Sequence, residues 1–209
     1  MSLTVVDHPL VADRVAVLRD PATDGADFRR LVREVAGYLA YEATRRLPTL
    51  PSTVRTSLGR EAVARRVAAP GPVVVPILRA GLGMLDGVLA ALPNAEVGVI
   101  GLRRDEQTLR PVVYAEKLRD DLSGRDAFVI DPMLATGGSL VAACEMLSAR
   151  GVTRVTALAL LAAPEGVAHV EAHCDGIEIF TAALDDGLDE RAFIVPGLGD
   201  AGDRLFGPA

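Results

Sequence analysis

VIDPMLATGGSLVAACEML, residues 129–147, contains an apolar run that ends at Asp131, followed by a turn from Thr136 to Ser139 and a helix-like stretch. In an open parallel sheet, ligands bind at the carboxyl ends of the strands. A glycine turn that enters a helix directs free N–H groups and the positive end of the helix dipole at an anion. The stretch therefore predicts a strand–turn–helix unit that binds a phosphate. An ordinary turn with Ser139 as the N-cap explains the turn about equally well.

Asp131 indicates what accompanies the phosphate. A carboxylate repels a phosphate, so Asp131 is expected to accept hydrogen bonds from neighbouring hydroxyl groups such as those of ribose. Gly137 and Gly138 let the backbone approach the ligand, and Thr136 and Ser139 add hydroxyl donors. A phosphorylated sugar satisfies both requirements.

The rest of the chain predicts an α/β fold, a mostly parallel twisted sheet with helices on both faces. The expected strands are 73–78, 97–102, 127–130, 155–163, 177–182 and 193–195. The expected helices are 81–91, 139–150 and 165–172, preceded by an amphipathic helix over 27–47. Residues 46–71 are interpreted as a connecting arm. With no linker or repeat, residues 1–209 are expected to form one domain, with a small appendage after Ala182.

Composition narrows the possible functions. No apolar run reaches the roughly 20 residues of a membrane helix, and the N-terminus does not resemble a secretion signal, so a cytoplasmic protein is expected. A net charge of −6 argues against a general nucleic-acid surface. Cys144 and Cys174 are expected to be reduced, buried thiols.

Arg79 lies at the end of a predicted strand in VVVPILRAGLGMLDGVL, residues 73–89. An arginine beside exposed glycine backbone suits pyrophosphate. Gly81, Gly83 and Gly87 also resemble a loosened dinucleotide fingerprint, which leaves a nicotinamide-dependent enzyme as the alternative. The G-x-G-x-x-G formed by Gly197, Gly199 and Gly202 is followed by too few residues for a βα unit, so it is not interpreted as a dinucleotide-binding motif.

Two further segments have polar features. Arg104 ends a predicted strand, and the polar residues 105–124 are long enough for an extended hairpin that acts as a lid or is only a solvated loop. The glycine-rich stretch AFIVPGLGDAGDRLFG, residues 192–207, is expected to have little helix or strand to satisfy its backbone groups. A planar base with acceptor, donor and acceptor edges, such as uracil, could pair with them, although a turn-rich tail is the simpler alternative.

Taken together, five blocks resemble the uracil phosphoribosyltransferase family in order and spacing, over about residues 5 to 207. They are VVVPILRAGLGM, VIDPMLATGGS, LLAAPEGVA, TAALDDGLDE and IVPGLGDAGDRLFG. The resemblance implies a type I phosphoribosyltransferase core with a C-terminal hood (about residues 183–209), assembled as a homodimer or higher homo-oligomer. It implies the reaction of uracil with phosphoribosyl pyrophosphate to give UMP and pyrophosphate.

The resemblance also assigns roles. Arg79 and Arg104 would neutralise the pyrophosphate, and main-chain groups of Ile194, Gly199 and Ala201 would bind uracil. Asp200 would contact the sugar-pyrophosphate or its Mg²⁺, an ion expected to bind mostly ligand oxygens and water. The ribose hydroxyls and 5′-phosphate would be bound by Asp131, Pro132, Met133, Leu134, Ala135, Thr136, Gly137, Gly138 and Ser139.

Two positions bear on this assignment. Pro132 stands where many other phosphoribosyltransferases have a second acidic residue, which favours the uracil branch, and Phe193 stands where relatives commonly have tyrosine. An RNA-binding regulator on the same core would need a basic face, which the acidic composition disfavours. A P-loop kinase is excluded because G-x-x-x-x-G-K-[ST] does not occur.

Overall fold

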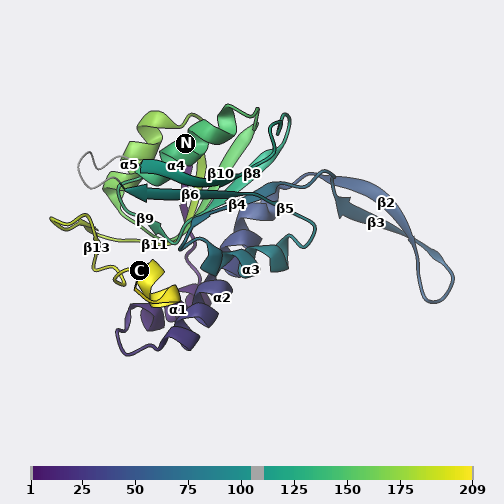
Figure 1. Ribbon diagram of the computed structural model, residues 1–209. Helices are drawn as coiled ribbons and strands as arrows, with labels where there is room; N and C mark the ends of the chain where they lie inside the picture. The colour runs from purple at the N-terminus through teal and green to yellow at the C-terminus, as the bar shows by residue number, and fades with distance from the viewer. Residues whose placement is uncertain (1, 105–110, 209) are drawn as a thin grey trace.

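The computed structural model describes residues 2–104 and 111–208. The centre is a twisted sheet in the order β1-β11-β10-β8-β4-β6-β7, with β5 added beside β4 and β9 beside β10 (Figure 1). All neighbours in it are parallel except β6 and β7. The strands are β1 Ser2–Val5, β4 Val73–Leu78, β5 Glu96–Val97, β6 Val99–Arg104, β7 Pro111–Lys117, β8 Asp126–Ile130, β9 Met133–Leu134, β10 Arg154–Ala162 and β11 Glu178–Leu184.

Helices cover both faces of this sheet, as the sequence predicts for an α/β protein (Figure 1). One face is covered by α1 Pro9–Arg19, α2 Gly25–Ala43 and α3 Leu82–Ala91, and the other by α4 Gly138–Ser148 and α5 Pro164–His173. The hood carries β12 Gly187–Leu188, β13 Ile194–Val195 and α6 Ala201–Phe206. No helix in the described ranges combines the length and apolar character needed to cross a bilayer.

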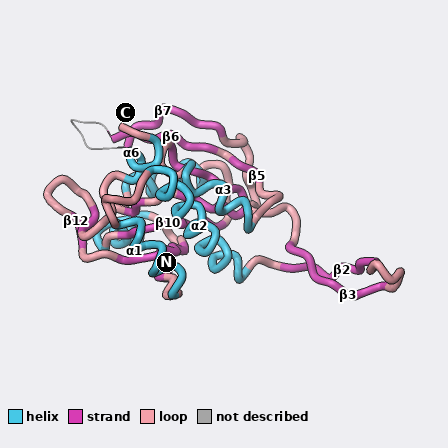
Figure 2. The backbone as a smooth tube through the Cα atoms, turned by 90° about the horizontal axis from the view of Figure 1, so that it is seen from below, coloured by secondary structure: helices cyan, strands magenta, loops and turns pink. Residues whose placement is uncertain are grey.

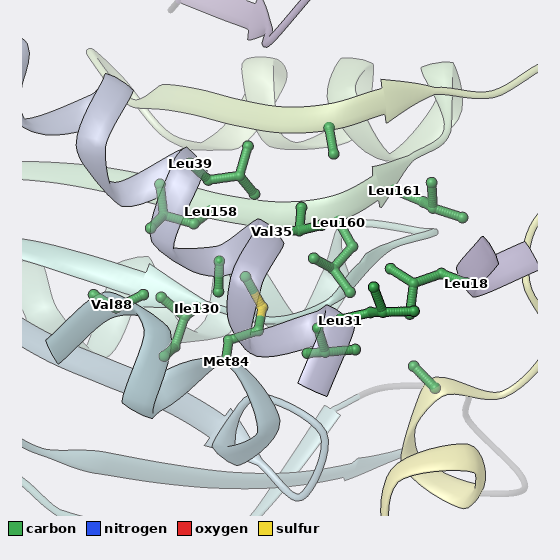
Figure 3. Packing of buried hydrophobic residues seen from close by; sticks show 14 of the residues in the cluster. Leu18, Leu31, Val35, Leu39, Met84, Val88, Ile130, Leu158, Leu160 and Leu161 are labelled. Carbon is green, nitrogen blue, oxygen red and sulfur yellow. The ribbon is translucent and has the colours of Figure 1, made fainter. Parts of the chain in front are cut away.

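The alternation of side chains along the central strands explains the two faces. In β10, Leu158 and Leu160 pack among α1, α2 and α3, whereas Ala157 and Ala159 pack under α4 and α5. Figure 3 shows Leu158 and Leu160 among side chains of α2 and α3, with Leu31 pointing into the same cluster. Both faces of β10 are therefore buried, which accounts for its nearly continuous apolar sequence.

The amphipathic helix predicted over 27–47 is α2, and its predicted apolar stripe is fully buried. The helix begins two residues earlier because the Asp24 carboxylate accepts hydrogen bonds from the N–H groups of Ala26 and Asp27. It ends at Ala43, where a 3₁₀ turn over Thr44–Arg46 follows.

The structure corrects two sequence predictions. The connecting arm is an antiparallel hairpin of β2 Thr49–Arg55 and β3 Glu61–Val67 that projects away from the body (Figure 1 and Figure 2). Glycine-rich residues 192–207 contain more regular structure than expected, because α6 forms after the predicted strand 193–195, which is β13. The sequence analysis also did not predict β1 and α1, which lie beside β11 and α2.

Candidate active site

The carboxyl ends of β8 and β9 form a loop with a cavity of about 120 Å³. Gly137 adopts a left-handed φ of 81° just before α4, and a Cβ there would lie 2.7 Å from the carbonyl oxygen of Gly166. A side chain would clash with the start of α5, so this turn requires glycine. The cavity is lined by Val129, Asp131, Met133, Leu134, Ala135, Thr136, Gly137, Ser139, Leu140, Ala157, Leu158 and Ala159.

Backbone donors lie in the loop and in the first turn of α4, next to this cavity. In the described part of the chain, no group accepts from the N–H groups of Gly137, Gly138 and Ser139. These groups belong to the first turn of α4, where backbone donors have no intrahelical partner and the helix dipole is positive. The arrangement is suited to binding a tetrahedral anion.

Asp131 lines both this cavity and a larger one of about 400 Å³. Its carboxylate accepts a hydrogen bond from the Met133 N–H, but burial dominates and raises the pKa of Asp131 to about 7. Hydroxyl groups that donate to the carboxylate would stabilise its charged form. The geometry therefore favours a ligand with an anionic group in the small cavity and hydroxyls beside Asp131.

The larger cavity lies between the end of β4 and the hood. Arg79 lines it, with a side chain that is 44 % exposed, and its one polar side-chain contact with the described residues is the long one of 3.5 Å from Nη2 to Asp203 Oδ1. Most of its guanidinium donors therefore remain available to an anion. The lining consists of Arg79, Ala80, Asp131, Met133, Ala135, Arg191, Ala192, Phe193, Ile194, Gly199, Asp200, Ala201, Gly202 and Asp203.

Ile194, Gly199 and Ala201 of the hood line the same cavity. Asp189 N–H donates to Phe193 O at 2.8 Å, so the adjacent pair of Leu188 with Ile194 is a non-hydrogen-bonded pair of the ladder. The peptide groups of Ile194 consequently point away from β12. Elsewhere in the hood, the N–H groups of Gly199 and Ala201 have no acceptor within the described ranges.

Asp200 has a structural role that the sequence did not predict. Its Oδ1 accepts from the Asp203 N–H at 2.9 Å and caps α6. The other carboxylate oxygen has no partner among the described residues, and Asp200 is exposed at the cavity.

Most of the sequence-predicted site residues whose side chains the structure describes line these two cavities, but Gly138 and Pro132 do not. Gly138 begins α4 without lining either cavity, and Pro132 is buried, with a carbonyl that accepts from Leu160 N at 2.9 Å and Leu161 N at 3.1 Å. Pro132 therefore connects β9 to β10. The side chain of Arg104, at the end of β6, and residues 105–110 of the predicted lid lie outside the described part of the structure.

Sequence reasoning missed Ala80, Arg191 and Asp203 as cavity residues. Arg191 lies over the Phe193 ring, with 5.5 Å from Cζ to the ring centroid. Phe193 also lines the cavity, but it lacks the hydroxyl group of the tyrosine that relatives commonly have at this position. Arg191 and Asp203 lie close in sequence to predicted residues, but nothing in their spacing marks them as cavity residues.

A strand–turn–helix loop and a second cavity at the carboxyl edge of a mostly parallel sheet are typical of one class, the phosphoribosyltransferases of type I fold. The fold is shared with adenine phosphoribosyltransferase from Leishmania donovani, with a TM-score of 0.59 at 13% identity over 91% of this chain and 86% of that one. A solved protein from Aquifex aeolicus superposes with a TM-score of 0.93 at 36% identity, covering 99% of each chain.

The particular family follows from the sequence comparisons. Residues 5–208 match the family model for uracil phosphoribosyltransferase. The uracil phosphoribosyltransferase of Kineococcus radiotolerans is 56% identical over 210 residues, covering 99% of each chain, and that of Streptomyces coelicolor is 53% identical over 211 residues, covering 100% of each. The chain belongs to the uracil phosphoribosyltransferase family.

Proposed function

We propose that this chain transfers the phosphoribosyl group of phosphoribosyl pyrophosphate to N1 of uracil, giving UMP and pyrophosphate for pyrimidine salvage. The observation that carries the proposal is the position of Asp131, whose carboxylate lines both cavities. A ribose beside Asp131 would have its 5′-phosphate in the small cavity and its anomeric carbon in the large one.

Phosphoribosyl pyrophosphate binding divides between the two cavities. The N–H groups of Gly137, Gly138 and Ser139 would donate to the 5′-phosphate. The Asp131 carboxylate would accept from the ribose hydroxyls, and Arg79 would neutralise the pyrophosphate. We assign Arg104 the same role because it ends β6 at the carboxyl edge of the sheet.

Uracil recognition would fall to the hood backbone. The edge of uracil presents carbonyl acceptors on either side of the N3–H donor. The N–H groups of Gly199 and Ala201 would donate to carbonyl oxygens, and Ile194, whose peptide groups point away from β12, would contribute a further main-chain contact to the base.

The reaction would proceed by displacement at the anomeric carbon through an oxocarbenium-like transition state. The bond from uracil N1 to C1′ forms, the bond from C1′ to pyrophosphate oxygen breaks, and the N1 proton leaves to water or pyrophosphate. No enzyme nucleophile is required. The protein contributes by aligning the two ligands, stabilising the leaving-group charge with Arg79 and Arg104, and excluding water.

Magnesium fits this site as an ion held mainly by the substrate. The described residues contain no group of three metal-ligating side chains, and Asp200 offers one carboxylate oxygen that its capping bond leaves available. This donor set suits Mg²⁺, which keeps several waters and binds few carboxylates. When bound, the ion would neutralise charge on the departing pyrophosphate.

We also propose that the chain forms a homodimer through the β2–β3 hairpin and that it works in the cytoplasm. The hairpin exposes apolar side chains, including Val63 at 93 % exposure, together with Leu58 and Leu50. A second copy would cover this surface. The cytoplasmic assignment agrees with the cysteine content, because Cys144 and Cys174 are the only two cysteines and are too few for the disulfide framework of a secreted protein.

The test is UMP formation from uracil and phosphoribosyl pyrophosphate with Mg²⁺, separated by chromatography and matched to the pyrophosphate released. Equal molar yields of UMP and pyrophosphate are expected. Pyrophosphate release without UMP would mean that water, not uracil, is the acceptor, and no turnover by folded protein would reject the proposal.

A further inference from the structure

An ion pair between a partly exposed arginine and a buried aspartate joins α1 to the start of the hood. The guanidinium of Arg19, the last residue of α1, contacts both oxygens of Asp185, with 2.5 Å from Nη2 to Oδ1 and 2.8 Å from Nη1 to Oδ2. The Asp185 side chain is only 3 % exposed. A bidentate pair of this kind fixes both the distance and the orientation of its two partners.

The same ion pair holds both polar backbone groups of Gly197. Its N–H donates to Asp185 Oδ2 at 2.9 Å, and its carbonyl accepts from Arg19 Nη1 at 2.7 Å. Gly197 lies in the irregular segment between β13 and α6, where no strand ladder or helix sets its position. Its position therefore depends on these two side chains.

A second arginine fixes the next residue of the segment. Arg204 donates through Nη1 to the carbonyl of Leu198 at 2.8 Å and to that of Leu18 at 2.5 Å, and through Nη2 to that of Asp20 at 2.7 Å. Its guanidinium lies over the Phe28 ring at 4.2 Å, and burial lowers the pKa of Arg204. The carbonyls at the end of α1 and that of Leu198 thus share one cation.

We infer that Arg19 and Asp185 are positioning residues for uracil, which they hold indirectly by fixing the main chain between Ile194 and Gly199. The inference rests on the proposed function, in which that main chain binds the base. Hydrogen bonds to a base tolerate errors of only about 0.5 Å in the donor and acceptor positions. Neither residue lines the cavities, so both act on the base through Gly197.

The experiment uses Asp185→Asn and two substitutions of its partner, Arg19→Gln and Arg19→Lys. Asparagine keeps the shape of the side chain and one acceptor for the Gly197 N–H, but it removes the charge that pairs with Arg19. Arg19→Gln removes the cation, and Arg19→Lys keeps the charge without the planar fork that contacts both carboxylate oxygens.

The expected result is a rise of about tenfold in KM for uracil for Asp185→Asn and Arg19→Gln, the usual scale for losing a charge-assisted bond. The KM for phosphoribosyl pyrophosphate and kcat are expected to stay within about threefold, because the strand–turn–helix loop is untouched. Arg19→Lys should fall between Arg19→Gln and the wild type.

Glu34→Gln is the matched control. Glu34 lies on α2 and pairs with Arg14, which is on α1 like Arg19, at 2.9 Å between Arg14 Nε and Glu34 Oε2. The ion pairs of Glu34, with Arg14 and Arg30, do not involve the hood. This variant should keep the wild-type KM for uracil. A general loosening of α1 would instead raise KM for uracil in the control as well.

The inference is wrong if Asp185→Asn and Arg19→Gln leave KM for uracil unchanged, or if they raise KM for both substrates equally. Should Asp185→Asn fail to fold by circular dichroism, the two Arg19 variants decide the question, because that side chain is partly exposed. Failure of the proposed function is seen separately, since the wild-type chain would then form no UMP.

Discussion

Asp131→Asn is expected to stabilise the free protein while it impairs the enzyme. Burial raises the pKa of Asp131 from 3.8 to about 7, a difference that corresponds to at most about 4 kcal/mol of stability above pH 7. Because Asp131 keeps part of its surface open to solvent at the cavities, we expect about half of that, roughly 2 kcal/mol. Asparagine has a similar shape without the buried charge.

The raised pKa of Asp131 determines how the stability difference between the variant and the wild type changes with pH. The folded carboxyl has a higher pKa than the unfolded one, so the wild-type chain loses stability as pH rises from about 4 through about 7. Asparagine does not titrate. The stability advantage of Asp131→Asn should therefore grow across this interval and stay constant at higher pH.

Urea unfolding of both proteins at pH 5, 6 and 8, followed by circular dichroism, measures this difference. In the same variant, KM for phosphoribosyl pyrophosphate should rise far more than KM for uracil, because the carboxylate faces the ribose. A variant less stable than wild type at pH 8, or a gap that does not change with pH, would refute the assigned environment of Asp131. Equal weakening of both substrates would refute its role.

Three further predictions concern other parts of the molecule. Arg79→Ala should lower kcat/KM for phosphoribosyl pyrophosphate by at least about 100-fold, as for the loss of one charge-stabilising contact, and near-wild-type kinetics would remove Arg79 from the site. Gly137→Ala should lower the free energy of unfolding, measured in urea, by at least about 2 kcal/mol, and Gly176→Ala by only about 1 kcal/mol. Both glycines have positive φ, but of the two only Gly137 has a backbone oxygen within 3 Å of a new Cβ. Equal losses would mean that the predicted clash is absent. Val63→Glu should shift the sedimentation coefficient from dimer to monomer, and a variant that sediments like the wild type would exclude the hairpin as the interface.

The sequence predicted the strand–turn–helix unit at the candidate site because the information is local. The apolar strand, Asp131 and the Thr136–Ser139 turn lie next to one another, and the periods of two and 3.6 residues predicted the sheet and the helices. The same local reasoning missed α6, which is only six residues long, contains Gly202 and is followed by Gly207.

Other features are not local and could not be predicted in this way. The hairpin strands β2 and β3 have mostly exposed side chains, so no buried face gives them an alternating apolar pattern. Arg19 and Asp185 are 166 residues apart, and each is an ordinary charged residue in its own segment. Only the fold, which sets the end of α1 beside the end of β11, brings them together.

The most direct test of the account is the ratio of kcat/KM for uracil to that for cytosine with the wild-type protein and Mg²⁺. Cytosine has an amino group in place of one carbonyl and lacks the N3–H, so it would leave main-chain groups of the hood unpaired. We predict a preference for uracil of about 10⁴-fold. Comparable turnover of the two bases would contradict recognition by the backbone of Ile194, Gly199 and Ala201.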